Sequence, residues 1–147
     1  ADEPLSALDV SIQAQILNLL QKLREETKIT FLFISHDLKI VNYFSDTVGV
    51  MYLGKIVEHA KTEDLFKNPM HPYTVLLLSS APKIRVHPSD VRHQPDTGEV
   101  PSPIHIPSGC PFHPRCPKRF KPCDKIVPQL KEAKGRLVSC HLWNPYE

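Results

Sequence analysis

Ala1-Asp2-Glu3-Pro4-Leu5-Ser6-Ala7-Leu8-Asp9 opens the chain, and Ser35-His36-Asp37 comes later, after a run of β-branched and aromatic residues. The opening stretch has two adjacent acids, a short loop and a third acid, Asp9. The Asp9 carboxylate can cap a following helix, because it accepts hydrogen bonds from the free N–H groups of a first turn. In an open α/β sheet, ligands bind beyond the carboxyl ends of the strands. Because His36 follows that run, we expect it to face a ligand at such an edge of an α/β fold.

Hydrophobic spacing predicts the elements around these two stretches. Apolar residues recur at helical spacing over about 10–26, and the run 29–34 has the pattern of a short strand buried on both faces of a parallel sheet. A helix over 38–44 should follow His36. Further along, the sequence predicts strands over 47–52 and 55–58 with a turn at Leu53-Gly54, a helix that begins at Thr62, and a helix that begins at Pro72 and ends at Pro82.

Composition excludes some classes of function and indicates a change along the chain. A formal net charge of +2 over 147 residues is too small for a nucleic-acid footprint. No apolar run is long enough to cross a bilayer, so any membrane association must come through a partner. Most of the fifteen prolines lie at or beyond Pro82, and all four cysteines lie at or beyond Cys110. We expect a small, loop-rich, cysteine-containing tail domain to follow the α/β part.

The acidic pair, the loop acid and the histidine resemble, in this order and spacing, the second half of an ABC-type ATPase, which is a P-loop enzyme. In that resemblance Asp2-Glu3 ends the Walker B strand, Ser6 to Asp9 form the D-loop, and His36 is the switch histidine. The resemblance implies that Asp2 holds Mg²⁺, Glu3 polarises the attacking water, and His36 hydrogen-bonds the γ-phosphate of ATP. Ser6 and Asp9 would lie at the interface with a second ATPase.

A nucleotide site of this kind also needs a Gly-rich phosphate loop with its lysine, and the 147 residues contain neither that loop nor a signature motif. The backbone amides and the lysine of such a loop supply most of the binding energy for the phosphates. We therefore expect the chain by itself to be inactive, without appreciable binding or hydrolysis of ATP.

Asn68-Pro69-Met70-His71-Pro72-Tyr73-Thr74 looks like the motif that opens the C-terminal extension of oligopeptide and dipeptide importer ATPases, and 99–103 and 108–117 continue the resemblance. It implies an ATPase subunit at the cytoplasmic face of the membrane. Its partners would be a second ATPase subunit, integral-membrane permease subunits and, indirectly, an extracytoplasmic substrate-binding protein. The His-Pro-Tyr residues themselves favour a structural role, in which His71 caps a helix, Pro72 starts it and Tyr73 packs.

The resemblance divides the chain into three parts. Residues 1–61 would be the C-terminal part of the nucleotide-binding domain, 62–82 a helical connector with the His-Pro-Tyr motif, and 83–147 a Pro- and Cys-rich extension. The alternative function is a non-catalytic metal- or Fe–S-binding interaction module. It predicts that 83–147 fold alone and bind a partner.

The cysteines of the tail are Cys110, Cys116, Cys123 and Cys140. Their spacing is not the close Cys-x2-Cys pairing of a common zinc ribbon. Four thiolates can hold a [4Fe–4S] cluster when loops bring them to its corners, and the family resemblance supports such a cluster. Zinc, free thiols and disulfides stay open as alternatives. His113 and His141 could replace a cysteine ligand, although their positions are more typical of surface-loop histidines.

Overall fold

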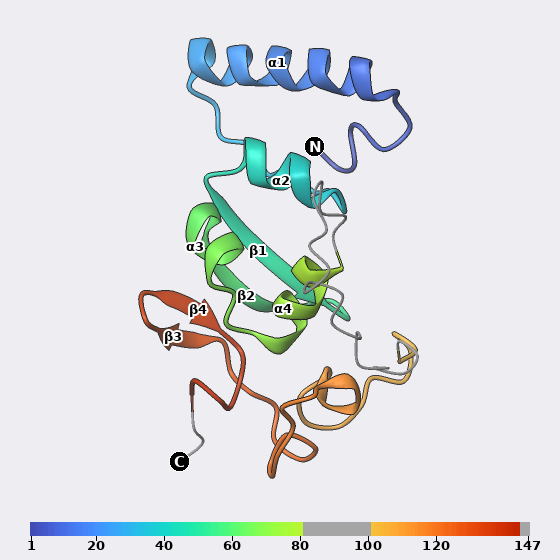
Figure 1. Ribbon diagram of the computed structural model, residues 1–147, viewed down its shortest axis with the longest axis vertical. Coiled ribbons are helices and arrows are strands. Elements are labelled where there is room, and N and C mark those ends of the chain that lie inside the picture. Colours follow the sequence, from blue (N-terminus) through green and yellow to red (C-terminus); the bar gives the residue numbers. More distant parts are fainter. Residues whose placement is uncertain (81–100, 145–147) are drawn as a thin grey trace, which may run out of the picture. The chain divides into compact units, whose positions relative to one another are not determined.

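The computed structural model describes residues 1–80 and 101–144. It divides the chain into two compact units, Ala1–Asp46 and Thr47–Glu147, each with its own packing. Helices and one four-stranded antiparallel sheet give the α/β character (Figure 1). The predicted stop at Pro82 and the stretch Glu99-Val100 lie outside the described residues. No helix within the described ranges combines the length and the apolarity that a bilayer crossing requires.

The first unit contains helices α1 (Val10–Thr27) and α2 (Leu38–Phe44), and both were predicted. Its core is a small cluster of Leu5, Leu17, Ile40 and Phe44. Phe31 and Phe33 pack their rings on Phe44, with centroids 5.7 and 5.1 Å away. The core therefore depends on residues that come from α1, from α2 and from the segment between them.

The segment 29–34 is not the doubly buried strand that the sequence predicts. Ile34 forms an isolated parallel bridge with Asp2, and the side chains of Leu32 and Ile34 are 79% and 50% exposed. Within the described residues this segment pairs with Ala1–Glu3 alone. The side chains on the outer face of this segment, Leu32 and Ile34, therefore have no second layer of secondary structure to pack against.

The cap of α1 also differs from expectation, and a side-chain cap lies on α2 instead. The Asp9 carboxylate makes no capping hydrogen bond; instead the Asp9 backbone carbonyl accepts the first helical bond, from Gln13 N at 2.8 Å. The capping carboxylate is that of Asp37, which accepts from Lys39 N at 2.8 Å and Ile40 N at 3.4 Å. A side-chain cap thus stabilises the short helix α2, where one bond matters most.

The sheet of the second unit has the order β1-β2-β4-β3. Strands β1 (Thr47–Tyr52) and β2 (Lys55–Lys61) turn at Leu53-Gly54, as predicted, although β2 runs three residues further than expected. The tail supplies β3 (Lys131–Ala133) and β4 (Arg136–Val138), and β4 pairs with β2. The tail is therefore loop-rich over 101–130 but completes the sheet at its end.

Helices α3 (Thr62–Lys67) and α4 (Pro72–Ser79) begin at the predicted residues. The core of this unit joins the sheet to the tail, because Phe112 packs against Tyr52 and Tyr73 with ring centroids 5.3 and 5.5 Å away. Phe112 and Leu65 are each only 1% exposed. Burying a side chain of this size stabilises the fold by roughly 1.5–3 kcal/mol. The cluster members are Val50, Tyr52, Val57, Ala60, Leu65, Cys110 and Phe112.

Candidate functional site

Three backbone hydrogen bonds pair the N-terminus with the segment that precedes His36. The Ala1 amine donates to Leu32 O at 2.9 Å, Ile34 N donates to Ala1 O at 2.8 Å, and Glu3 N donates to Ile34 O at 2.9 Å. The two segments run parallel. Residues that follow the paired positions therefore emerge at the same edge.

Glu3 and His36 meet at this edge. Nδ1 of His36 lies 2.9 Å from Oε1 of Glu3, so the ring donates to the carboxylate through Nδ1–H. The two side chains are 48% and 74% exposed for Glu3 and His36, respectively, which leaves both accessible from solvent. Glu3 also has a φ of 43°, in the left-handed region that few non-glycine residues adopt. Such backbone conformations are concentrated at functional sites.

The other predicted residues of this site lie along the adjoining loop. Ser6 N and Oγ both donate to Glu3 O, at 3.3 and 3.1 Å, which closes a turn under Glu3. Asp2 precedes Glu3 and is exposed, and Asp9 is exposed at the start of α1. Among the described residues, no hydrogen bond links Asp9 to Glu3 or His36. The structure thus brings Glu3, His36 and Ser6 together and leaves Asp9 at the far end of the loop.

The four cysteines of the second unit are free thiols that line one small cavity of about 10 Å³, together with three histidines. A cavity of that size has room for roughly one water molecule. In the described part of the chain, no group of three or more His, Cys, Asp or Glu side chains is already arranged to hold a metal ion. The lining residues include Cys110, Cys116, Cys123, Cys140, His71, His113 and His141.

Three of the four cysteine thiols have a raised pKa. Burial raises the pKa of Cys110 and Cys116 and raises that of Cys140 to about 11, so these thiols are neutral at pH 7. Hydrogen bonds to the sulfurs oppose that rise, and each comes from a backbone N–H two or three residues further along the chain. The donors are Phe112 and His113 for Cys110, Lys118 for Cys116, and Leu142 for Cys140.

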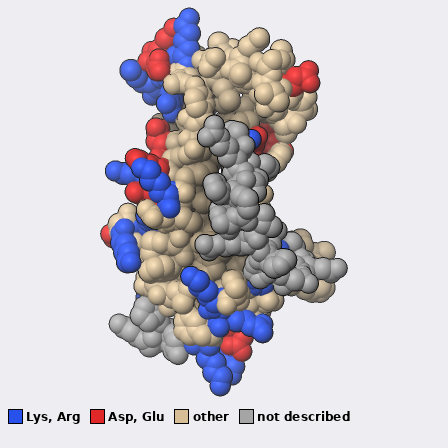
Figure 2. Space-filling model, in the orientation of Figure 1, with Lys and Arg blue, Asp and Glu red and all other residues tan. Residues whose placement is uncertain are grey.

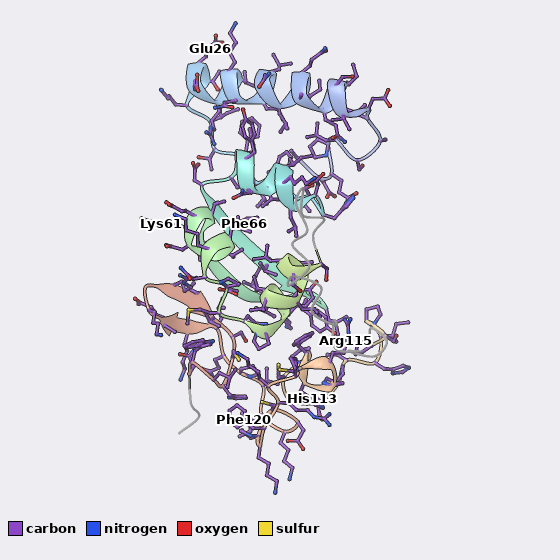
Figure 3. All side chains as sticks on the ribbon, in the orientation of Figure 1. Glu26, Lys61, Phe66, His113, Arg115 and Phe120 are labelled. Atoms are coloured by element: carbon purple, nitrogen blue, oxygen red, sulfur yellow. The ribbon has the colours of Figure 1, made fainter. Side chains whose placement is uncertain are left out.

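The three histidines are held by hydrogen bonds to the backbone. His71 caps α4 by accepting from Tyr73 N at 3.0 Å, as predicted. Nδ1 of His113 donates to Cys110 O at 3.0 Å from the short 3₁₀ turn η2 (His113–Arg115) beside the cysteine loops (Figure 3). His141 Nε2 donates to Ile126 O at 2.9 Å, and His141 is only 5% exposed. The surface-loop interpretation of His141 is therefore wrong, because the tail folds back over it.

Glu58 is a buried charge that sequence reasoning missed. Its carboxylate is fully buried and accepts from Met70 N and His71 N, both at 2.9 Å. Arg136 lies 3.7 Å from it and also donates to Asn68 O at 2.8 Å. No local pattern links Glu58 to residues so far along the chain, and its burial beside Val57 interrupts the alternation of β2.

The cysteine-bearing tail exposes mainly positive charge, as Figure 2 shows for one face. Residues 101–144 contain eight Lys and Arg but only two Asp and Glu. Phe120, on the same loop, is 43% exposed (Figure 3). The small net charge of the whole chain conceals this local excess.

Comparison with known proteins gives a family match for residues 57–123 and relatives over nearly the whole chain. Residues 57–123 match the family described as the C-terminal region of oligopeptide/dipeptide transporters. The chain is 52% identical to an oligopeptide transport ATP-binding protein, AppF, of Bacillus subtilis, with 98% of this chain and 44% of the relative covered. It is 50% identical to a dipeptide transport ATP-binding protein, DppF, of Escherichia coli, with 95% and 42% covered.

The chain thus spans less than half the length of these relatives. The matched family covers most of β2, the His-Pro-Tyr motif and the first three cysteines. Residues 57–123 therefore belong to the C-terminal region of the oligopeptide/dipeptide transporters, and the chain is related over nearly its whole length to the ATP-binding proteins of peptide transporters.

Proposed function

We propose that this chain is the C-terminal part of the ATP-hydrolysing subunit that energises import of oligopeptides or dipeptides. The observation that carries the proposal is the meeting of Glu3 and His36 at 2.9 Å, at the end of two segments in parallel pairing. A P-loop ATPase places its water-activating and γ-phosphate-sensing groups at such an edge. The relatives named as peptide-transport ATP-binding proteins support the same function.

In this proposal Glu3 polarises the attacking water through the carboxylate oxygen that His36 does not engage. His36 already donates through Nδ1, so a ring that carries both protons offers Nε2–H to a γ-phosphate oxygen. The exposed carboxylate of Asp2 fits Mg²⁺, a hard cation that prefers oxygen ligands and keeps much of its water. Bound Mg²⁺ neutralises the charge that develops on the phosphates.

Ser6 and Asp9 belong, in the same proposal, to the interface with a second ATPase subunit. Both are exposed on the loop that leads from Glu3 to α1, and Gln13 fixes that loop by donating to Leu5 O at 3.0 Å. Closure of two subunits would drive membrane-spanning permease subunits from the cytoplasmic face. The 147 residues alone, without a phosphate loop, would remain inactive.

The test uses the full-length subunit with Glu3→Gln. We expect Mg-ATP to bind as in the wild type, hydrolysis to fall by at least 10²-fold, and a closed dimer to accumulate in light scattering. Glu25→Gln, on the exposed side of α1, is the matched control and should hydrolyse ATP at the wild-type rate. Wild-type hydrolysis by the Glu3→Gln protein contradicts the proposal.

We further propose that Cys110, Cys116, Cys123 and Cys140 hold a [4Fe–4S] cluster. What supports this is the convergence of four thiols on one cavity. Four cysteine thiolates are the usual ligands of such a cluster. The small cavity requires the loops to move apart around the cluster, which would cross-link a tail with few core residues. A zinc ion bound by the same four thiols is the less favoured alternative.

Anaerobic purification tests the cluster. We expect a brown protein with about four iron and four sulfide per chain, and loss of the colour in Cys116→Ser. A protein with zinc in place of iron, or with neither metal, contradicts the cluster.

A further inference from the structure

Residues 117–127, which we call the basic loop, place positive charge on the surface of the tail. Asp124 is the single acidic residue of this loop. Its four cations are Lys118, Arg119, Lys121 and Lys125, and all four are exposed. In the two described ranges, no ion pair engages any of them. Lys and Arg predominate over this end of the tail in Figure 2, so their charge is available to an external anion.

Apolar side chains are exposed on the same loop. Phe120 is 43% exposed, and Ile126 and Val127 are 42% and 64% exposed. Phe120 stands between two cations in the sequence and is labelled on this loop in Figure 3. Contact between water and large apolar side chains is unfavourable. A partner that offers both negative charge and an apolar layer would therefore gain from both kinds of side chain.

Backbone hydrogen bonds fix the shape of the basic loop. Cys123 N donates to Phe120 O at 2.8 Å, and Ile126 N donates to Pro122 O at 3.0 Å. Ile126 O accepts from Nε2 of the buried His141 at 2.9 Å. The exposure of Phe120 is therefore a property of a folded turn, and little ordering is needed when the loop meets a surface.

An anionic bilayer fits this combination of side chains. Its phosphate groups attract Lys and Arg within a Debye length, about 8 Å at physiological salt, and its interface takes up apolar side chains. Lysine supplies three of the four cations; it is depleted at protein–protein interfaces, but its flexible stem suits a lipid headgroup region. A nucleic acid would leave Ile126 and Val127 in water, because aliphatic side chains offer no ring on which a base can stack.

We propose that the basic loop binds the surface of a membrane that contains anionic phospholipids. The four cations contact headgroup phosphates, and Phe120 enters the interface between headgroups and acyl chains. This contact is direct, in addition to any association through partner subunits. It uses neither a nucleotide nor a cysteine ligand, so its test is independent of the ATPase and of the cluster.

The experiment measures co-sedimentation of the 147-residue chain with vesicles. One set is phosphatidylcholine alone, and the other is phosphatidylcholine mixed with phosphatidylglycerol. We expect binding to the mixed vesicles to be at least tenfold tighter at low salt, and to weaken as the salt concentration increases. Sedimentation without lipid corrects for self-association. Equal binding to the two sets, or binding to neither, overturns the proposal.

A pair of double variants locates the contact. Arg119→Glu with Lys125→Glu should weaken binding to the mixed vesicles at least tenfold, since each cation near an anionic surface contributes about fivefold. Lys55→Glu with Lys131→Glu makes the same change in net charge on β2 and β3. This control should bind within about threefold of the wild type, because charges beyond a Debye length are screened. Equal losses in the two double variants overturn the assignment to the loop.

Phe120 is tested separately. Phe120→Ser should weaken binding about tenfold, because it removes the side chain that the interface buries. Phe120→Trp should bind like the wild type, and its emission should shift to the blue on the mixed vesicles, beyond any shift of Trp143, the single tryptophan of the wild type. Wild-type affinity of Phe120→Ser, or no added shift in Phe120→Trp, overturns the insertion of the ring.

A nucleic-acid arm completes the comparison. Fluorescence anisotropy with a labelled single-stranded RNA measures the same chain at the same salt concentrations. We expect weaker binding to the RNA than to the mixed vesicles. RNA binding that is tighter than vesicle binding, and that Arg119→Glu with Lys125→Glu abolishes, would assign the loop to a nucleic acid and overturn the membrane contact.

Discussion

Gly109 lies where two cysteine loops cross, and its missing side chain is what lets them approach. Cys110 N donates to Cys123 O at 2.8 Å directly beside it. A Cβ on Gly109 would lie 2.4 Å from Cys123 O, and the residue has a φ of +69°. The backbone contact that brings Cys110 and Cys123 to one cavity therefore depends on this glycine.

We predict that Gly109→Ala lowers the free energy of unfolding by about 3 kcal/mol or more, because strain at positive φ adds to a clash with backbone. Gly135→Ala is the control, since Gly135 has a φ of +76° but no atom within 4 Å of its would-be Cβ. That variant should lose only about 1–2 kcal/mol. Urea denaturation of both variants measures the difference, and equal losses would contradict the role of the loop crossing.

The buried carboxylate of Glu58 gives a second prediction for a single residue. Glu58→Gln replaces an acceptor of two backbone N–H groups by an amide that presents a donor to one of them, and it removes the buried charge near Arg136. The unfolding free energy should fall by about 2–4 kcal/mol. Glu63→Gln, which affects an exposed pair with Lys67, should leave the denaturation midpoint unchanged. A similar midpoint for both variants would show that the Glu58 carboxylate is not needed.

At the scale of elements, the two helices of the first unit differ in how they begin. α2 has seven residues and a side-chain cap from Asp37, whereas α1 has eighteen residues and no side-chain cap from Asp9. A short helix has few internal bonds to offset its unsatisfied N–H groups. The cap therefore matters more for α2.

We predict that Asp37→Ala costs about 1 kcal/mol of unfolding free energy, because it leaves Lys39 N and Ile40 N without their acceptor. Asp9→Ala should cost less than about 0.5 kcal/mol. Thermal denaturation followed by circular dichroism distinguishes the two. A larger loss for Asp9→Ala would show that its carboxylate caps α1 in solution.

The cap of α4 makes stability depend on pH. Burial lowers the pKa of His71 to about 4, against an opposing hydrogen bond to Ser139. Between about pH 6.5 and 4 the unfolded chain binds a proton that the folded chain does not, so stability is full above this window and falls as the pH decreases. The loss should reach about 3 kcal/mol in the wild type. Subtracting the pH profile of His71→Asn isolates it, and identical slopes in the two proteins would contradict it.

At the scale of the molecule, the second unit contains a complete sheet and the first contains a single bridge. β4 of the tail pairs with β2, and Phe112 of the tail packs on Tyr52 and Tyr73. The tail therefore shares its core with the β1–β2 hairpin and with the tyrosine of the His-Pro-Tyr motif.

We predict that residues 47–147 unfold cooperatively when produced alone, whereas 83–147 do not, because the shorter piece lacks β2 and the aromatic partners of Phe112. Dispersed amide proton resonances and a sigmoidal urea transition are the measurements. The alternative of an independent cysteine module predicts that 83–147 also fold alone, and a well-folded 83–147 would support that alternative.

The sequence by itself determined the local elements. The bounds of α2, the turn at Leu53-Gly54 and the start of α4 at Pro72 follow from residue spacing, turn chemistry and the fixed φ of proline. These causes act within a few residues, so a single sequence contains them. Glu3 and His36 were candidates because their order and spacing resemble those of an ABC-type ATPase, and the 2.9 Å between their side chains was not predicted.

Only the tertiary structure decided which distant residues meet. Packing alone buries Glu58, folds the tail over His141 and brings Cys140 to the cavity of Cys110. It also leaves the apolar segment 29–34 half exposed, where the sequence predicts burial. Burial depends on which layer lies opposite a residue, and that layer comes from elsewhere in the chain, so hydrophobic spacing cannot specify it.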